Sequence, residues 1–420
     1  MKLQLTAIAA AIALSSNFAI AQTVTSPANL DYVGAEAMPP SYGVDNNTTS
    51  EDDVAWSGGL PARGTFNAIN GSSFDSELGS MSGSSAVGGT NDSTIDQTTQ
   101  SGTSAAGNSA SVVQSGGDQN ESNVVQNKLG QGDALEAEVV QTGNQNRSDI
   151  NQELSFGAIA KVEQDGDGNL SRINQLGADS NGADVMQTGD DHRSIVEQGT
   201  NPGGAQNNNT FVTQTNTDNQ SFVRQQWNDN LADVDQNGNS GMSQIWQQSD
   251  GNIAMLSDTG TYNESYIRQG ETGTSDYNEA DVTQGGSYND SYISQLGGDY
   301  NEATVQQTGD YGTSDIFQNG EGNEAKVTQS GDGDVSWIIQ EGDDKIATVN
   351  QMGSGIAGSE FNESYILQTG AGAHNATVIQ DHDPSNGWNN VSTITQTAST
   401  VGNAYVEQTG SGNRASTIQY

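Results

Sequence analysis

The stretch Asn263-Glu-Ser-Tyr-Ile-Arg-Gln269 sets the pattern for most of this 420-residue chain. Its side chains alternate in character with period two, which is typical of a β-strand and not of a helix. In a strand, Ser265 and Ile267 point to the same face as the first and last residues, and the remaining three point to the other. Variants of the stretch recur from Asn91 to the C-terminus, so the fold follows from how these units stack.

The repeat is aligned on the glutamine that closes each unit. This alignment gives 27 units, most of them 11 or 12 residues apart, with Asp258 in place of the closing glutamine once. We call the first residue of a unit, six positions before the closing glutamine, the opening residue; it is most often asparagine. Longer intervals, in which we expect loop insertions, follow Gln97, Gln126, Gln198, Gln269, Gln351 and Gln380.

The slot two residues after the opening residue alternates between serine and alanine from unit to unit. Ser265, Ala280, Ser291 and Ala303 are examples. The next inward slot varies with it, because serine units mostly carry isoleucine and alanine units carry valine. Two alternating strand types predict layers of two facing strands, about 23 residues each. The sequence therefore predicts an all-β fold: a cross-β stack of two-strand repeats that forms a β-solenoid of about 13 layers.

The inward amides are the candidate functional residues. A buried polar group without a partner costs about 1–3 kcal/mol, but copies stacked about 4.8 Å apart can bond to one another in a continuous ladder. We interpret His192 and His374, which are opening residues, as substitutes within this ladder. The predicted structural amyloid ladder includes Asn263, Gln269, Asn278, Gln284, Asn289, Gln295, Asn301, Gln307, Asn323, Gln329, Asn362, Gln368, Asn413 and Gln419.

The amino-acid composition disfavours several classes of partner and several kinds of chemistry. The formal net charge of −41 disfavours nucleic acid and anionic membrane surfaces as partners, and the lack of cysteine excludes disulfides and thiol chemistry. The Asp165-Gly-Asp-Gly-Asn169 corner weakly resembles a calcium loop, without the spacing and bidentate glutamate of an EF-hand. Asp381-His-Asp383 is a weak metal candidate. We expect no metal site, no cofactor, no catalytic residues and no enzymatic activity.

The chain before Asn91 lacks the repeat. Residues 1–21 carry Lys2, an Ala-rich apolar run and an Ala19-Ile-Ala21 cleavage pattern, which predicts a secretory signal peptide. Residues 22–90 contain prolines, an acidic patch and a Gly/Ser-rich end, which predicts a flexible leader. Residues 91–420 form the predicted repeat domain, and no stretch in it is apolar enough to insert into a membrane.

The repeat resembles a known family. Gln318-Asn-Gly-Glu-Gly-Asn-Glu-Ala-Lys-Val-Thr-Gln329 is similar to the curlin repeat, and the resemblance covers residues 91–420. It implies a structural subunit of extracellular curli-like functional amyloid fibres, which support biofilm matrix and adhesion. It also implies secretion through the periplasm and an outer-membrane pore, a nucleator subunit as partner, and a homopolymer that grows by stacking of solenoid ends. The number of repeats is far above the usual, and serine stands where a larger apolar residue is common.

Three alternative functions can be compared with this pattern. The chain resembles the nucleator subunit of the same fibre system almost as well, although Tyr420 and the many repeats favour the major subunit. A soluble secreted β-solenoid that binds ice or another surface would need a flat outward array of threonine, whereas the outward slots here are mixed. An enzyme of the pectate-lyase type would need clustered carboxylates and basic residues, which are spread out or scarce here.

The residues in the outward slots support two further predictions. The middle outward slot of serine units contains the aromatic residues Phe222, Tyr266, Tyr292, Trp337 and Tyr365. They indicate either the strand propensity of aromatic residues alone or an exposed adhesive stripe. Glutamates in one slot of successive alanine units, Glu279, Glu302 and Glu324, predict a column of like charges about 4.8 Å apart. Such a column makes assembly sensitive to acid and to salt.

Overall fold

A computed structural model describes residues 91–99, 108–128, 134–199, 205–270, 276–353, 361–383, 389–397 and 399–420. The predicted signal peptide (1–21) and leader (22–90) lie outside these residues. The described chain divides into two units, which are treated separately. The N-terminal unit comprises the described residues up to Gly260 together with those of Ile267–Asn278, and the C-terminal unit comprises Thr261–Tyr266 and the described part of Glu279–Tyr420.

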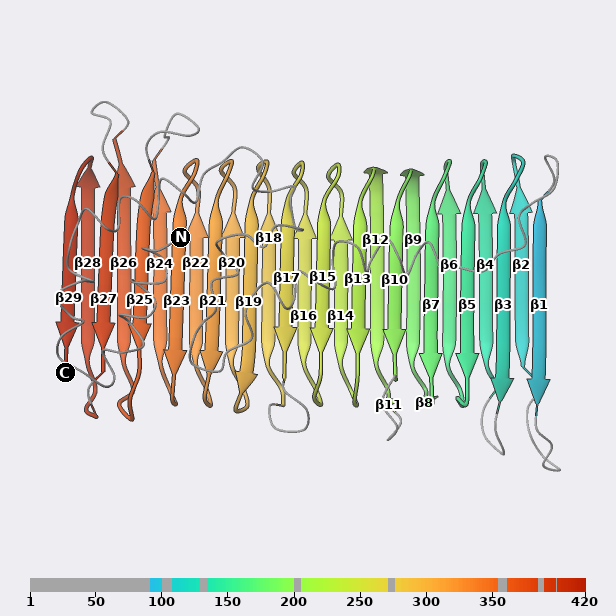
Figure 1. The fold of residues 1–420 in the computed structure, drawn as a ribbon, viewed down its shortest axis with the longest axis horizontal. Helices are drawn as coiled ribbons and strands as arrows, with labels where there is room; N and C mark the ends of the chain where they lie inside the picture. The colour runs from blue at the N-terminus through green and yellow to red at the C-terminus, as the bar shows by residue number, and fades with distance from the viewer. Residues whose placement is uncertain are drawn as a thin grey trace, which may run out of the picture. The chain divides into compact units, whose positions relative to one another are not determined.

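In the N-terminal unit, successive strands alternate between two parallel sheets (Figure 1). Sheet A contains β1 (Asp92–Thr99), β3 (Glu121–Lys128), β5 (Arg147–Glu153), β7 (Leu170–Leu176), β10 (Arg193–Gln198), β13 (Gln220–Gln225) and β15 (Met242–Gln247). Sheet B contains β2 (Ser109–Ser115), β4 (Glu136–Thr142), β6 (Ile159–Asp165), β9 (Gly182–Asp190), β12 (Asn209–Thr217), β14 (Leu231–Gln236) and β16 (Ile253–Asp258). A short third sheet pairs β8 (Ala178–Asp179) with β11 (Ala205–Gln206).

The C-terminal unit repeats this plan. Its sheet A contains β19 (Asp290–Gly297), β21 (Thr313–Asn319), β23 (Val335–Glu341), β25 (Asn362–Gln368), β27 (Asn390–Gln396) and β29 (Arg414–Gln419). Its sheet B contains β18 (Glu279–Gln284), β20 (Glu302–Gln307), β22 (Glu324–Gln329), β24 (Ile346–Met352), β26 (Asn375–His382) and β28 (Asn403–Gly410). The remaining strand, β17 (Glu264–Gln269), belongs to sheet A and has residues in both units.

The pairing confirms the predicted fold, a parallel two-sheet β-solenoid. Among the described residues, sheet A has 14 strands and sheet B has 13, which together match the 27 repeat units. Strands of sheet A carry the serine units in register, with Ser314 beside Ser291 and Ser336. Strands of sheet B carry the alanine units, with Ala325 beside Ala303 and Ala347. Each layer therefore places a serine strand opposite an alanine strand, as the alternation predicts.

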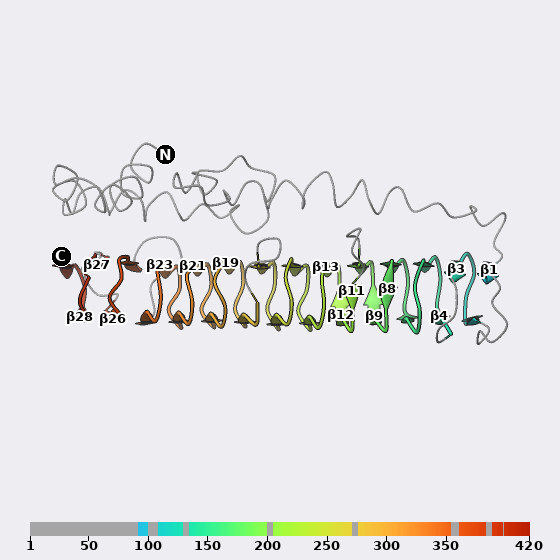
Figure 2. The same cartoon turned by 90° about the horizontal axis from the view of Figure 1, so that it is seen from below.

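The core lies between the two sheets, which Figure 2 separates into two layers of strands within each unit. Ile293, Ile316 and Ile338 of sheet A and Val305 and Val327 of sheet B are completely buried. Such small and medium side chains pack at the roughly 10 Å spacing of stacked sheets. Most closing glutamines and most opening asparagines are buried in the same interior.

The corners use two different backbone devices. At Gly166, φ is 133°, a conformation that glycine adopts without steric cost. At Gly309, φ is ordinary, and glycine is needed because a Cβ atom there would collide with the carbonyl oxygen of Gly331 in the next layer. Glycine therefore serves two purposes at the corners: it supplies a positive φ at Gly166, and it allows close approach between layers at Gly309 and Gly331.

Candidate functional site

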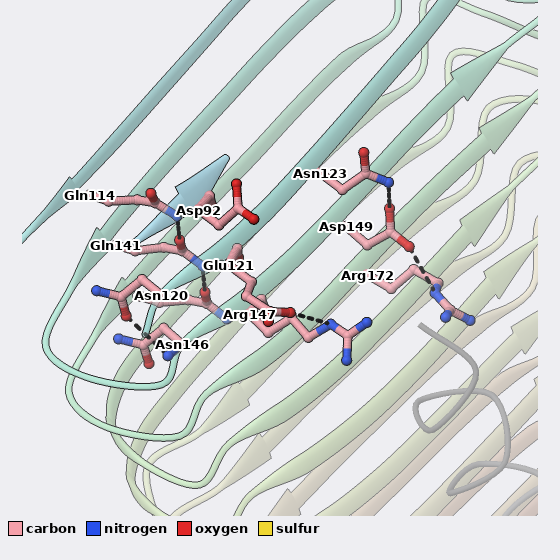
Figure 3. A network of polar contacts seen from close by, with 11 residues as sticks. Asp92, Gln114, Asn120, Glu121, Asn123, Gln141, Asn146, Arg147, Asp149 and Arg172 are labelled. Atoms are coloured by element: carbon pink, nitrogen blue, oxygen red, sulfur yellow. Dashed lines mark hydrogen bonds and ion pairs between the residues drawn. The ribbon is translucent and has the colours of Figure 1, made fainter. Parts of the chain in front are cut away.

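The closing glutamines form rows of side-chain hydrogen bonds that run from layer to layer within each unit. In sheet B of the C-terminal unit, the Gln307 Nε2 amide donates to Gln329 Oε1 at 2.9 Å, and Gln329 donates to Gln351 at 2.9 Å. Gln284, Gln380 and Gln408 continue this row. The N-terminal unit has the same arrangement, and Figure 3 shows its Gln114 amide directed at Gln141, 2.8 Å away.

Each closing glutamine also joins the two sheets. Gln329 Nε2, in sheet B, donates to the carbonyl oxygen of Thr313, the first residue of a sheet A strand, at 2.9 Å. In the opposite direction, Gln318 Nε2 of sheet A donates to the carbonyl oxygen of Glu302 in sheet B at 2.9 Å. One amide therefore bonds to the next layer and to the facing sheet, so a single glutamine stabilises the stack in two directions.

The opening asparagines form rows of a different kind. The backbone amide of Gly312 donates to Asn289 Oδ1 at 2.7 Å, so the side-chain oxygen accepts from the main chain of the next layer. Asn289 Nδ2 donates to the carbonyl oxygen of Gly309 at the neighbouring corner, at 2.8 Å. Side-chain to side-chain bonds also occur in this row, as between Asn323 Nδ2 and Asn301 Oδ1 at 3.0 Å. The sequence predicts that asparagine side chains bond mainly to one another. In the structure, most asparagine side-chain oxygens of these rows instead accept hydrogen bonds from backbone amides of the next layer.

The structure places every residue of the predicted ladder in one of these rows. Closing rows contain Gln269, Gln284, Gln295, Gln307, Gln329, Gln368 and Gln419, and opening rows contain Asn263, Asn278, Asn289, Asn301, Asn323, Asn362 and Asn413. All are buried except Asn413 and Gln419, which are partly exposed.

Two histidines replace asparagine in opening rows and make equivalent bonds. His192 Nδ1 accepts the backbone amide of Asn219 at 3.3 Å, and its Nε2 lies 3.2 Å from the carbonyl oxygen of Thr188. His374 accepts from Gly402 in the same way. A neutral imidazole with its proton on Nε2 satisfies both contacts at His192. Burial lowers the pKa of His192, which favours this neutral form.

Two charged residues also occupy opening slots. Asp334 is buried, and its carboxylate accepts from the backbone and side-chain amides of Asn362 at 3.0 Å. Burial raises the pKa of Asp334 to about 7 in spite of these bonds. The Lys345 amine donates to the carbonyl oxygens of Gly370 and Gly372, and burial lowers the pKa of this lysine. An ionised aspartate can only accept and a charged lysine can only donate, so in these forms each supplies half of what asparagine supplies.

The outer faces of the two sheets differ in charge. Sheet A carries every arginine of the described residues, namely Arg147, Arg172, Arg193, Arg224, Arg268 and Arg414. Several pair with carboxylates of neighbouring strands, as where Arg172 approaches Asp149 at 3.9 Å and Asn123 donates to the same carboxylate at 3.1 Å (Figure 3). Sheet B instead carries the glutamate column, with Glu302 paired between Glu279 and Glu324.

The predicted exposed aromatic stripe is wrong. Tyr266, Tyr292 and Phe222 are each 1% exposed and Trp337 is 7% exposed, although they point away from the core. Ring contacts along the sheet contribute to this burial, since the Trp337 ring meets Tyr365 edge-on at 5.3 Å. On the outer face of sheet B, Tyr405 is 60% exposed. Aromatic residues in sheet A therefore pack against neighbours instead of forming an open adhesive surface.

Threonine does not form an array on sheet B. The outward column beside the alanines contains Asp281, Thr304, Lys326 and Thr348 in successive strands. An ice-binding face needs the same small hydroxyl side chain in each layer, so this column does not favour that alternative.

The calcium-like motif falls at an ordinary corner, whereas Asp381 and His382 of the weak metal candidate lie at the end of β26. The Asp167 carboxylate accepts the backbone amide of Asn144 at 2.7 Å, which makes it part of the corner hydrogen bonding. Within the described residues, no group of three or more His, Asp or Glu side chains could hold a metal ion. The same residues contain no helix with the length and hydropathy needed to cross a membrane.

The sequence interpretation missed one group of residues, the tyrosines that precede opening residues. Tyr262, Tyr277, Tyr288, Tyr300 and Tyr311 all have φ between 56° and 60°, in the left-handed region. The repeated Tyr-Asn dipeptide was the available signal, since the residue before each opening residue lies at a corner.

Comparison with family models identifies the repeat. Residues 276–309 and 320–353 each match the curlin-associated repeat, and the matched segments span β18 to β20 and β22 to β24. The chain belongs to the curlin family. Curlin proteins are extracellular, typically non-enzymatic components of curli-type amyloid fibres, and the family suggests self-assembly. No curated protein matches the chain.

Proposed function

We propose that this curlin-family chain is the major structural subunit of an extracellular fibre, in which copies stack end to end and lengthen both glutamine rows. The fibre supports a biofilm matrix and adhesion, and the chain reaches it by secretion through the periplasm and an outer-membrane pore. A nucleator subunit starts assembly, and the chain has no catalytic role.

The closing rows are the observation that carries this proposal. They run through parallel, in-register strands, and each row can continue into another copy with the same bonds as between Gln307, Gln329 and Gln351. Parallel β-layers expose unpaired backbone groups at their edges, which favours addition of further strands. A chain with many such layers adds more fibre length per copy than a short starter would, which supports the major-subunit role.

The fibre is tested with purified protein from residue 22 to residue 420. Soluble protein should show β-structure by circular dichroism and then convert to fibres with thioflavin fluorescence. Aligned fibres should diffract at about 4.8 Å along the fibre axis and about 10 Å across it. A β-folded protein that stays monomeric at all concentrations, even with preformed seeds, would refute the fibre function.

The subunit role is tested separately by mixing. When a small amount of this protein is added to another curlin-repeat subunit, it should not shorten the lag phase of that subunit's fibre assembly. Immunogold micrographs should show this chain along the whole length of the fibres. Strong shortening of the lag, with label confined to fibre ends, would assign the chain as the nucleator instead.

A further inference from the structure

Three tyrosines of the C-terminal unit occupy backbone positions that do not need a tyrosine. Tyr262, Tyr288 and Tyr311 precede the opening residues of β17, β19 and β21, and their φ values are 56°, 59° and 60°. The left-handed conformation is unfavourable for residues with a Cβ atom and costs glycine nothing. The corresponding corner before β23 uses Gly333, with φ of 73°. Backbone geometry therefore disfavours tyrosine here, and the rings must contribute something else.

The three rings form one stack. The Tyr262 and Tyr288 ring centroids are 5.1 Å apart with planes at 16°, and the Tyr288 and Tyr311 centroids are 5.1 Å apart with planes at 2°. Rings in successive layers thus lie face to face at nearly the spacing of the strands themselves.

Corner hydrogen bonds fix the register of the stack. The Tyr288 backbone amide donates to the carbonyl oxygen of Thr261 at 2.9 Å, and the Tyr311 amide donates to Ser287 at 2.8 Å. The Ser287 amide donates to Asp310 Oδ1 at 2.8 Å in the same corner. Because each corner bonds to the next, the rings keep the same partners.

The stack is accessible at the edge of the solenoid. Tyr262 is 37% exposed, and Tyr288 and Tyr311 are partly exposed. An oxidant in solution can therefore reach the phenols, whereas Tyr266 and Tyr292 on the outer face of sheet A are 1% exposed.

We propose that Tyr262, Tyr288 and Tyr311 form an oxidative cross-linking site, at which a haem-peroxidase-type catalyst and hydrogen peroxide join neighbouring phenols as dityrosine. Each phenol loses one electron and one proton to become a tyrosyl radical. Two radicals form a bond between their ortho carbons, and the two ring hydrogens shift to the oxygens. Hydrogen peroxide takes up the two electrons and two protons and becomes two molecules of water.

Such a bond would fasten successive layers covalently. The chain contains no cysteine, so disulfides cannot do this. A carbon–carbon bond between Tyr288 and either neighbour links strands that hydrogen bonds alone hold in register. The site is independent of the proposed fibre function, because all three rings belong to one chain.

The test treats dilute, folded protein with horseradish peroxidase and hydrogen peroxide, and then cleaves it after Asp and Glu. This cleavage separates the three tyrosines, because acidic residues such as Glu264, Asp290 and Asp299 lie between them. Mass spectrometry should find Tyr262 joined to Tyr288, and Tyr288 joined to Tyr311, each pair two hydrogen atoms lighter than the separate peptides.

Two variants decide the outcome. Tyr288→Phe keeps the ring but cannot form a phenoxyl radical, and the outer tyrosines are then two layers, roughly 10 Å, apart. We expect it to fold as the parent by circular dichroism and to lose both linked peptides and most dityrosine fluorescence. Tyr405→Phe removes an exposed tyrosine outside the stack and should keep the parental yield. Equal yields from Tyr288→Phe and the parent, or links mainly through Tyr405 or Tyr420, would overturn the proposal.

Discussion

The two polar rows inside sheet B of the C-terminal unit accept substitution very differently. Strands β20, β22, β24, β26 and β28 all close with glutamine, whereas their opening residues are Asn301, Asn323, Lys345, His374 and Gly402. A closing glutamine bonds to the next layer and to the facing sheet, and no other side chain has the same length and donor count. An opening residue serves one corner, where backbone groups can rearrange. Side chains that join two directions at once are therefore the constrained ones.

The largest effect is expected from breaking a closing row. Gln329→Ala removes the partner of Gln307 and leaves the carbonyl oxygen of Thr313 without this donor. We expect a loss of about 1–3 kcal/mol in the free energy of unfolding, with slower fibre growth. Asn323→Ala, in the opening row of the same strand, should cost less. Urea denaturation compares them, and equal losses would remove the distinction between the rows.

The next effect concerns a carboxyl in the opening row of sheet A. The pKa of Asp334 is raised from 3.8 to about 7, mainly by burial, so the folded state holds a proton that the unfolded state releases between these values. The contribution of this carboxyl to stability is therefore complete below the unfolded value of 3.8. It falls by about 1.4 kcal/mol per pH unit between 3.8 and about 7, and it does not change further above pH 7. Asp334→Asn should abolish this fall. Urea midpoints of parent and variant between pH 4 and pH 8 measure it, and parallel curves would contradict the assignment.

A smaller effect of opposite sign is expected at His192. Burial lowers its pKa, so its contribution to stability is complete above the unfolded value of 6.5 and is lost as the pH falls below it. His192→Asn keeps an acceptor for the amide of Asn219 and does not titrate. The variant should lose less stability than the parent between pH 7 and pH 5, by about 1 kcal/mol. A thermal-melt difference that does not depend on pH would count against this role.

The smallest effects are expected outside both rows. Lys326→Ala, on the outer face of sheet B, should change stability by less than about 0.5 kcal/mol. Burial, and then Glu324 and Glu279, raise the pKa of Glu302, so acid should relieve the glutamate column and moderately speed fibre growth. Glu302→Gln should reduce that response. Thioflavin kinetics that are the same at pH 7 and pH 4, and with millimolar Ca²⁺, would show that hydrated carboxylates do not repel measurably.

Periodicity was sufficient to predict the strands and their sheets. The closing glutamines mark the strand ends, and the change from Ser291 to Ala303 separates sheet A from sheet B, because parallel stacking without offset places like residues beside like. The inward placement of Gln307 and Gln329 followed from the same alternation.

Features that depend on the path of the corner were not predictable from that alternation. Asn289 accepts from the backbone of Gly312 because the corner brings that amide close, and Gly309 is required by the carbonyl of another layer. The burial of Tyr292 depends on which residues pack against the outer face of its sheet. A seven-residue repeat carries no information about those residues. Local pattern determines where a side chain points, whereas its partners depend on the tertiary arrangement.

The glutamine rows have a direction. Within each unit, the amide nitrogen of the glutamine earlier in the sequence donates to the oxygen of the one that follows, as from Gln307 to Gln329 and from Gln318 to Gln340. The side-chain dipoles consequently align head to tail and add along the row instead of cancelling. Any stack of these layers is electrically polar, since one end presents carbonyl oxygens and the other presents N–H groups. An incoming layer meets different chemistry at the two ends, so elongation is expected to be vectorial.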